Sequence, residues 1–225
     1  MYQTWSHLLF LHWEWDPAEI QKTLPPGLTV DLHEGKTYLG IVPFYMRNIR
    51  PRFLPAVPWI SNFLELNVRT YVHDEKGRPG VWFYSLDCNQ PLAVWTARTF
   101  FHLPYFHARM SAPLTEPSSV AYSKHRRGAV SASNFHYRLE GEPTYPEPGS
   151  LEFFLLERYY LFAKAPGGIL SGQVSHVPYP MVQARVDQWD TKVLALNGFA
   201  EPNRPPDHIC GSPGVDVHIY PLTTR

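Results

Sequence analysis

Prolines and glycines occur along the whole chain and leave few uninterrupted stretches long enough for a helix. The 225 residues include 23 prolines and 14 glycines. Proline breaks a helix because its ring clashes with the preceding turn and because it has no N–H to donate. The stretches between these breaks are rich in aromatic and β-branched residues, which favour strands. The pattern predicts an α+β, β-rich fold with a few short helices.

A charged, glycine-containing turn joins the two best-defined strands. Residues 62–73 and 81–88 are rich in apolar residues, and Asp74, Gly77 and Pro79 lie between them. This arrangement predicts an antiparallel hairpin. Further strands are predicted at residues 36–46, 105–110, 120–126, 129–139, 159–163, 169–177 and 215–220, with a hairpin turn at residues 166–168.

The helices are predicted mainly from their boundary residues. Asp16 suits the N-cap of a helix at residues 17–22, and Pro17 suits its first position. A helix at residues 91–101 has apolar residues on two stripes, so we expect it to be plugged into a barrel or packed between sheets. Two more are expected at residues 152–156 and 191–197. Residues 47–59 should form a long loop that could arch over a site.

Composition sets limits on size, partners and location. A chain of this length buries roughly 70 to 75% of its unfolded surface, so we expect one domain over residues 1–225. Twenty basic and twenty acidic residues cancel, and the short basic run at residues 124–127 is interpreted as a solvated turn or strand end, which argues against nucleic-acid binding. No apolar run reaches the roughly 18 residues of a membrane span. With no signal peptide and no paired cysteine motif, we expect a cytoplasmic protein without a membrane partner.

Several short motifs follow one another over most of the chain. They are Phe10-Leu11-His12-Trp13, Leu24-Pro25-Pro26-Gly27-Leu28, Gly40-Ile41-Val42-Pro43-Phe44, residues 65–72, Ser85-Leu86-Asp87, residues 98–104, Glu157-Arg158-Tyr159 and residues 176–180. Together they resemble the YqjF-like proteins, a bacterial family of unknown function related to the acetoacetate decarboxylase-like superfamily. The resemblance implies the fold of that superfamily, an antiparallel or mixed β-barrel or curved sheets with a few short helices.

Residues 97–108 resemble the catalytic motif of acetoacetate decarboxylase, in which an arginine, aromatic residues and a proline precede two lysines. The first of those lysines forms a Schiff base with the substrate. Here Tyr105 and Phe106 stand at the two lysine positions. The change removes both the amine and the adjacent cation that makes it nucleophilic. The six lysines that the chain does contain lie near predicted turns or element ends, so we expect them to be solvated and do not expect acetoacetate decarboxylase activity.

The strand at residues 62–73 carries a polar face. Alternation places Glu65, Asn67, Arg69 and Tyr71 on one side, which is either the wet outside of a sheet or the lining of a cavity. The resemblance favours a cavity, because it places Glu65 at an acidic pocket residue and Arg98 at the arginine of the helix motif. Burial would raise the pKa of Glu65, whereas a nearby arginine would lower it. Glu65 is therefore either a proton-carrying acid or the structural partner of an arginine.

The neighbourhood of the missing lysines supplies the other candidates. His102 could act as a general acid or base, and Tyr105 could donate a hydrogen bond to a carbonyl or carboxylate. His107 could contact a ligand, although it could equally satisfy backbone groups. Tyr105 and Phe106 alternate along a strand, so only the inward-facing one can take part. Catalytic candidates are thus Glu65, His102 and Tyr105, and ligand-binding candidates are Arg69, Arg98 and His107.

Three functions fit these features. The leading one is a pocket protein that binds a small organic acid or carbonyl metabolite without covalent catalysis. The second is an enzyme that uses acid–base chemistry, such as enolisation, dehydration or a lyase reaction, and the third is a scaffold or partner-binding domain with a filled cavity. Histidines spaced five apart do not share a face, so no metal is expected, and no cofactor motif is present. A homo-oligomer remains a possible partner, because the superfamily often forms oligomers.

Overall fold

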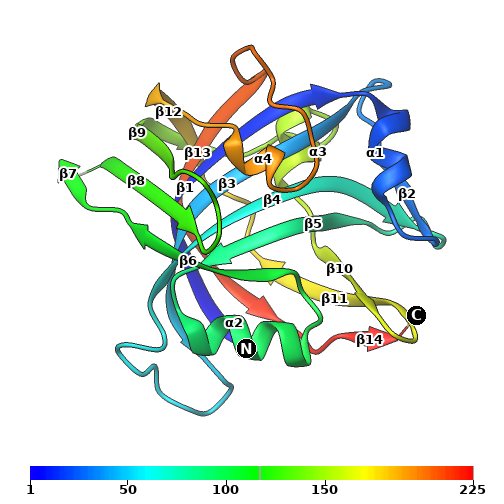
Figure 1. The fold of residues 1–225 in the computed structure, drawn as a ribbon, viewed down its shortest axis with the longest axis horizontal. Coiled ribbons are helices and arrows are strands. Elements are labelled where there is room, and N and C mark those ends of the chain that lie inside the picture. The colour runs from blue at the N-terminus through cyan, green and yellow to red at the C-terminus, as the bar shows by residue number, and fades with distance from the viewer. Residues whose placement is uncertain (117, 225) are drawn as a thin grey trace.

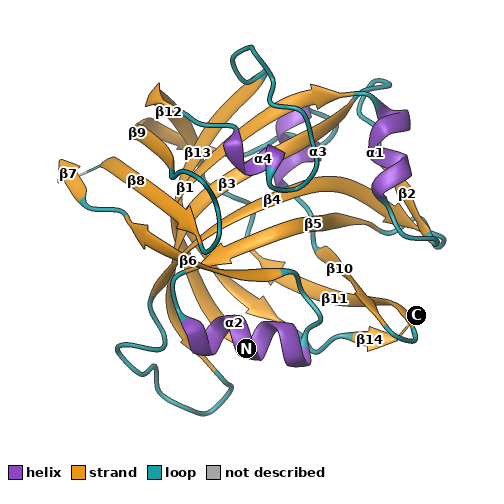
Figure 2. Cartoon of the chain, viewed as in Figure 1, coloured by secondary structure: helices purple, strands orange, loops and turns teal. Residues whose placement is uncertain are grey.

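The computed structural model describes residues 1–116 and 118–224. The elements are β1 (Tyr2–Trp15), α1 (Pro17–Thr23), β2 (Leu28–Val30), β3 (Thr37–Arg50), β4 (Phe63–Asp74), β5 (Pro79–Cys88), α2 (Pro91–Phe100), β6 (Tyr105–Ser111), β7 (Leu114–Glu116), β8 (Ser119–Arg126), β9 (Ser133–Thr144), α3 (Leu151–Leu156), β10 (Tyr160–Ala165), β11 (Gly168–His176), β12 (Met181–Gln188), α4 (Lys192–Ala195), β13 (His208–Ile219) and β14 (Thr223–Thr224). Strands dominate, and the helices lie around them (Figures 1 and 2).

The described strands form one mixed, curved sheet of 14 strands. Most neighbours are antiparallel, whereas β5 runs parallel to both β6 and β10. Pairing passes from β13 through β1, β3, β4, β5, β10 and β11, and then returns from β11 to β13. These strands therefore close a ring. The predicted β-rich fold of curved sheets with a few short helices is confirmed.

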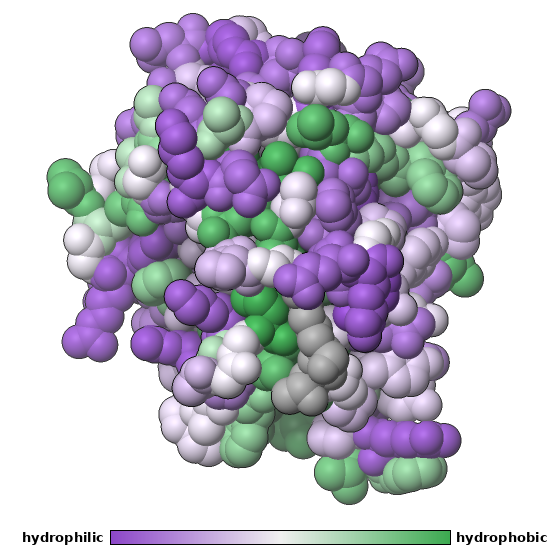
Figure 3. All heavy atoms as spheres, turned by 90° about the vertical axis from the view of Figure 1, so that its right-hand side faces the viewer, coloured by the Kyte–Doolittle hydropathy of each residue, from purple (hydrophilic) through white to green (hydrophobic). Residues whose placement is uncertain are grey.

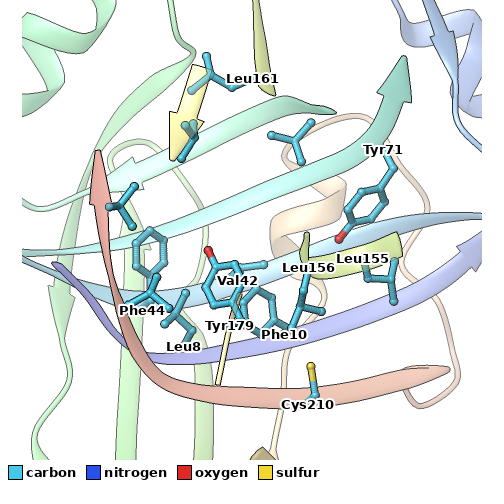
Figure 4. Packing of buried hydrophobic residues seen from close by; sticks show 14 of the residues in the cluster. Leu8, Phe10, Val42, Phe44, Tyr71, Leu155, Leu156, Leu161, Tyr179 and Cys210 are labelled. Atoms are coloured by element: carbon cyan, nitrogen blue, oxygen red, sulfur yellow. The ribbon is translucent and has the colours of Figure 1, made fainter. Parts of the chain in front are cut away.

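The central strands are buried on both faces, so they contribute to two cores. One face of β1, β3 and β4 contributes to a cluster that includes Phe10, Val42 and Tyr71, to which α3 adds Leu155 and Leu156. Figure 4 shows these side chains pointing toward one another from the strands and from α3. The opposite face contributes Leu66 and Val68 to a second cluster with residues of β8, β9 and α4. Double burial explains why these strands contain so many apolar residues.

Local signals correctly predicted two features. The side chain of Asp16 accepts a hydrogen bond from the Ala18 N–H and caps α1, with Pro17 in the first turn. The predicted hairpin is β4–β5, where the Asp74 carboxylate accepts from the backbone N–H groups of Lys76 and Arg78. A side chain that satisfies turn donors in this way fixes the turn without help from distant residues.

Other predictions were wrong in extent or in packing. The long strands β1 and β12 were not predicted, and β3 continues to Arg50, so the loop that precedes β4 covers residues 51–62. The helix α2 is neither plugged into a barrel nor packed between sheets, because only Val94 is buried along it. Its two apolar stripes misled the prediction, since periodicity does not show whether a stripe is covered. Among the described residues, no helix has the length and apolarity needed to cross a bilayer.

Candidate functional site

A cavity of about 560 Å³ lies within the ring of strands. Its wall is mainly apolar, with Val42, Phe44, Phe83 and Leu161 among the lining residues. The exposed members of the wall come largely from the loop 51–62 and from α2, so the cavity opens between these two segments. Its volume falls in the range typical of small-molecule sites.

The polar part of the wall is a stripe along β4. Glu65, Asn67 and Arg69 alternate with residues of the second core and all line the cavity, while their side chains are almost fully buried. The register with β5 shifts between Val68 and Arg69, and Tyr84 is the extra residue on β5. This bulge keeps Phe83 opposite Arg69 on the cavity side. The interpretation of the polar face as a cavity lining, rather than a wet outer face, therefore agrees with the structure.

Glu65 is a buried carboxyl group held by neutral donors. The Tyr105 hydroxyl donates to Glu65 Oε2 at 2.6 Å. Burial raises the pKa of Glu65 to about 7, while hydrogen bonds from Tyr105 and Asn67 oppose the rise and the charge of Asp87 adds to it. No arginine is bonded to Glu65 among the described residues. The hydrogen-bond partner of Glu65 is thus a tyrosine hydroxyl and not an arginine, and burial favours the protonated form of the carboxyl group.

Tyr105 and Phe106 point to opposite sides of the sheet. Tyr105 lines the cavity, and burial, followed by the charge of Glu65, holds its pKa well above the usual value. Phe106 lies opposite Asp87 and beneath the guanidinium of Arg126, at 4.3 Å from ring centroid to Cζ. The inward residue is therefore Tyr105. A neutral hydroxyl stands where the resemblance would place a nucleophilic amine.

Arg69 is a buried cation without an acidic partner. Its Nε donates to the Tyr71 hydroxyl at 3.3 Å, and its Nη2 donates to the Leu155 carbonyl at 3.1 Å. No carboxylate among the described residues forms an ion pair with it. By contrast, Arg158, which also lines the cavity, is neutralised by Asp31 at 2.5 Å. Burying an unpaired charge is costly, so the Arg69 guanidinium favours an anion in the cavity.

A buried chain of rings holds Arg69 in place. The Tyr71 hydroxyl accepts from Arg69 and lies 2.7 Å from His12 Nε2, and His12 Nδ1 lies 3.0 Å from His208 Nδ1. Burial, with smaller contributions from His208 and Arg69, holds the pKa of His12 well below its usual value. A neutral His12 can then accept a hydrogen bond from the Tyr71 hydroxyl at Nε2 and donate a hydrogen bond from Nδ1 to His208 Nδ1. This network fixes the guanidinium and was not predicted from the sequence.

The other three candidates lie outside the cavity wall. Arg98 is exposed on α2, and His102 is exposed just after that helix with a left-handed φ of 49°. His107 is half-buried between β5 and β8, where its carbonyl accepts from the Arg127 N–H. The structure brings together Glu65, Arg69 and Tyr105. It does not bring Arg98, His102 or His107 to them.

Lys124 corrects the expectation that every lysine is solvated. Its side chain is 1% exposed, and its ammonium lies 2.8 Å from Asp87 Oδ2. Arg126 also bonds Asp87 through Nε and Nη2, so half of the basic run 124–127 is buried. Burial lowers the pKa of Lys124, and Asp87 opposes that shift. Asp87 lies opposite Leu66 on the second-core face, so this amine is on the far side of the sheet from Glu65.

Asn67 is a cavity residue that the sequence analysis placed on the polar face but did not select. It is 4% exposed, and its Oδ1 has no hydrogen-bond partner. Its position between Glu65 and Arg69 in the alternating pattern was the available signal. No cluster of three or more His, Cys, Asp or Glu side chains within residues 1–116 and 118–224 is arranged to hold a metal ion.

Comparisons with known proteins identify relatives of the sequence. The DUF2071 family, described as an uncharacterized conserved protein, matches residues 2–216. The uncharacterized protein YqjF of Bacillus subtilis (strain 168) is 35% identical over 206 residues, which cover 92% of this chain and 85% of that protein. The family match therefore extends over most of the ring of strands and its cavity, while residues 217–219, through which β13 pairs with β11, follow the matched range.

Comparisons with solved structures identify the fold. An acetoacetate decarboxylase-like enzyme from Sphingomonas wittichii RW1 superposes with a TM-score of 0.65 and 15% identity, over 99% of this chain and 91% of that chain. The enduracididine biosynthesis enzyme MppR complexed with pyruvate gives a TM-score of 0.63 and 12% identity, over 98% and 87%. Acetoacetate decarboxylase from Legionella pneumophila gives 0.60 and 11%, over 99% and 87%. At these identities the likeness establishes the fold alone.

Proposed function

Because the chain belongs to the DUF2071 family and has an acetoacetate decarboxylase-like fold, we propose that it binds a small organic acid or carbonyl metabolite non-covalently in the cavity. The observation that carries this proposal is Arg69, a buried guanidinium on the wall of an open cavity, for which the described residues provide no carboxylate partner. A ligand carboxylate would supply the missing charge through a charge-assisted hydrogen bond. The structure of MppR with pyruvate is a fold relative that holds a small oxo acid.

The Glu65–Tyr105 pair supplies the second contact. Along a strand, residues four apart are separated by roughly 13 Å between Cα atoms, and the Arg69 side chain can span part of that distance. A ligand that places its carboxylate at Arg69 would direct its other end toward Glu65. A protonated Glu65 can donate to a carbonyl oxygen, and an ionised Glu65 can accept from a hydroxyl group. Asn67 Oδ1 offers one more acceptor between them.

The first test compares two arginines. Purified protein is titrated calorimetrically with a panel of monocarboxylic, hydroxy and oxo acids. We expect Arg69→Met to weaken binding of the acids that bind the unaltered protein about 10- to 150-fold, because a hydrogen bond to a charged group contributes about 1.5 to 3 kcal/mol. Arg98→Met is the matched control, because Arg98 is exposed and does not line the cavity. Equal losses in both variants, or no bound acid in the panel, would contradict the proposal.

A second test addresses the non-covalent part of the proposal. Tyr105 occupies the position that the resemblance assigns to the Schiff-base lysine, and no described residue that lines the cavity is a lysine. Incubation with an oxo acid and borohydride should therefore leave the intact mass unchanged. A stable adduct on any lysine, Lys124 included, would refute non-covalent binding and leave the carboxylate contact to be judged from the arginine variants.

One observation favours the acid–base enzyme as a second candidate. A pKa of about 7 lets Glu65 take up and release a proton near neutral pH, which suits a general acid or base. Glu65 would then remove a proton next to a ligand carbonyl while Arg69 holds the carboxylate. Deuterium exchange into an oxo acid, followed by NMR, should rise with pH through 7 and disappear in Glu65→Gln. His102 has no place in this scheme, since it lies outside the cavity.

The cavity is open rather than filled by the protein's own side chains, which disfavours the scaffold function. We propose a cytoplasmic location for the binding activity. Support comes from Cys88 and Cys210, both of which are free and buried, as is usual in a reducing compartment.

A further inference from the structure

Large apolar side chains are exposed around the mouth of the cavity. In the loop 51–62, Phe53 is 89% exposed and Trp59 is 86% exposed, and in α2 Trp95 is 57% exposed. We call the following six residues the mouth patch: Phe53, Leu54, Trp59, Leu92, Trp95 and Phe100, all of which are exposed. The loop and α2 lie at the same, lower end of the molecule in Figure 1. In the side view of Figure 3, hydrophobic groups are visible at that lower end as well as higher on the same face.

The mouth patch is tied together by specific contacts. The Gln90 side chain caps α2 by accepting from the Leu92 N–H, and it also donates to the Trp59 carbonyl at 2.8 Å. Trp95 and Phe100 pack edge to face with centroids 5.7 Å apart. Loop and helix thus present one connected surface. Contiguous apolar surface of this kind marks interaction sites, whereas isolated exposed apolar residues are ordinary.

The two segments that carry the mouth patch have charged residues of one sign. Residues 35–64 and 88–115, which contain both segments, include no Asp or Glu. Arg52 and Arg98 are exposed beside the patch, and no carboxylate among the described residues forms an ion pair with either of them. The guanidinium of Arg52 lies over the Phe53 ring at 4.9 Å. Aromatic and cationic side chains are therefore exposed together in these segments, although the net charge of the chain is zero.

We propose that the mouth patch docks onto a lipid surface that carries anionic headgroups. Tryptophan and phenylalanine place apolar rings at the boundary between headgroups and acyl chains. Unpaired arginines are attracted to the negative potential of such a surface. Docking in this orientation turns the cavity opening toward the lipid, so an amphiphilic ligand can pass between lipid and cavity without crossing water.

A second copy of the chain is a less suitable occupant of the mouth patch than a lipid surface. A symmetric contact would bring Arg52 and Arg98 of one copy near the same residues of the other, and like charges brought together oppose association. A lipid surface has no such conflict. The earlier expectation of no membrane partner rested on the absence of a spanning segment, which does not test a surface contact.

Flotation with vesicles tests the proposal. The protein is mixed at low salt with vesicles of phosphatidylcholine alone or of phosphatidylcholine with 30% phosphatidylglycerol. We expect binding to the anionic vesicles and a loss of that binding at high salt. Phe53→Ser combined with Trp59→Ser should reduce the bound fraction at least about tenfold. Arg52→Gln should weaken the partition coefficient about fivefold, since one arginine near an anionic membrane contributes about 1 kcal/mol.

The controls come from another turn of the same chain. Val130 is fully exposed, and Arg127 is exposed near it between β8 and β9. Val130→Ser and Arg127→Gln should leave vesicle binding unchanged. The proposal is overturned if anionic vesicles are not bound or if the control variants lose as much binding. It is also overturned if sedimentation velocity shows a dimer that Phe53→Ser with Trp59→Ser dissociates, because the patch would then serve a second copy.

Discussion

Glu65 shows how one buried carboxyl group gives folding a dependence on pH. Its pKa is about 7 in the folded protein and about 4.5 as the ordinary value. Because the pKa is raised in the folded protein, the unfolded chain loses this proton at a lower pH than the folded protein does. The group therefore lowers stability as pH rises from about 4.5 to about 7. The full effect is roughly 3 kcal/mol, because one pKa unit corresponds to about 1.4 kcal/mol.

We predict that Glu65→Gln removes this dependence. The variant should match the unaltered protein in free energy of unfolding near pH 4 and exceed it by up to roughly 3 kcal/mol at pH 8. Urea denaturation at both pH values measures the difference. Tyr105→Phe is a useful companion, because it removes a hydrogen bond that lowers the Glu65 pKa, and it should increase the loss of stability at pH 8. A Glu65→Gln variant with the same difference at both pH values would show that Glu65 is not protonated in the folded state.

A buried ionic cluster on the other face of the sheet gives a second prediction. Asp87 holds both Lys124 and Arg126. Asp87→Ala would leave two buried cations without a counter-ion, and we expect a loss of about 3 to 5 kcal/mol. Glu116→Ala, which breaks the exposed pair with Arg138, should cost no more than about 1 kcal/mol. Chemical denaturation of both variants makes the comparison. Equal costs would show that Lys124 and Arg126 reach water when Asp87 is absent.

At the scale of elements, the parallel contact between β5 and β10 completes the ring with few pairs. The partners are Val81 with Leu161 and Trp82 with Phe162. Gly80 allows this approach, because a Cβ at that position would lie 2.5 Å from the Tyr160 carbonyl oxygen. We predict that Gly80→Ala separates the strands and lowers stability by about 1 to 3 kcal/mol.

Gly167 provides the control for this element. A Cβ there meets nothing within 4 Å, so Gly167→Ala should leave the melting temperature nearly unchanged. Differential scanning calorimetry of the two variants compares them directly. If the Gly80→Ala and Gly167→Ala proteins had the same melting temperature, β10 would be able to move away from β5 without loss of stability.

Which elements could be predicted depended on whether their signals were local. The α1 cap and the Asp74 turn are satisfied by residues within a few positions, so the sequence contained the whole explanation. β1 lacks such a signal, because His7 adopts a left-handed φ of 52° within it and His12 interrupts its apolar run. α2 was predicted at the correct position but with the wrong packing. Whether an apolar stripe of α2 is covered depends on segments distant in sequence, such as the loop 51–62 across the cavity mouth. Periodicity within the helix does not contain that information.

At the scale of the whole molecule, four buried or half-buried histidines make stability depend on pH in the direction opposite to Glu65. Burial is the leading cause that lowers the pKa values of His7, His12, His176 and His208. A lowered pKa means that the unfolded chain binds these protons first, so stability from this source is complete above about pH 6.5 and is lost as pH falls below it. We therefore expect a stability maximum that Glu65 shifts toward acid.

Calorimetry can separate the two contributions. Unfolding at pH 6 in two buffers of different ionisation enthalpy gives the number of protons taken up. Glu65→Gln should take up nearly one proton more than the unaltered protein, because Glu65 releases its proton on unfolding at this pH. Equal uptake in the two proteins would argue against the raised pKa of Glu65.

The site was predictable where it follows one strand. Alternation along β4 placed Glu65, Asn67 and Arg69 on one face, and the resemblance to a known motif directed attention to Tyr105. Arg98 and His102 were selected from their positions in that motif, yet they lie on the exposed end of α2. The orientation of a helix relative to a cavity is a tertiary property, so the spacing of the motif could not supply it. The His12–Tyr71–Arg69 contacts join β1 to β4, and they too could not be predicted from the sequence, because they depend on how two strands distant in sequence pair in the sheet.

The strand β4 separates the cavity from a filled core. On the core side, the Tyr122 hydroxyl donates to the Glu65 carbonyl at 2.7 Å, and Leu66 and Val68 are fully buried there. A displacement of β4 cannot make room for a wider ligand, because the close-packed neighbours on the core face of β4 leave no free volume. Adjustment is left to the solvent-facing loop 51–62 at the entrance. The cavity should thus accept ligands of different length far better than ligands of different width.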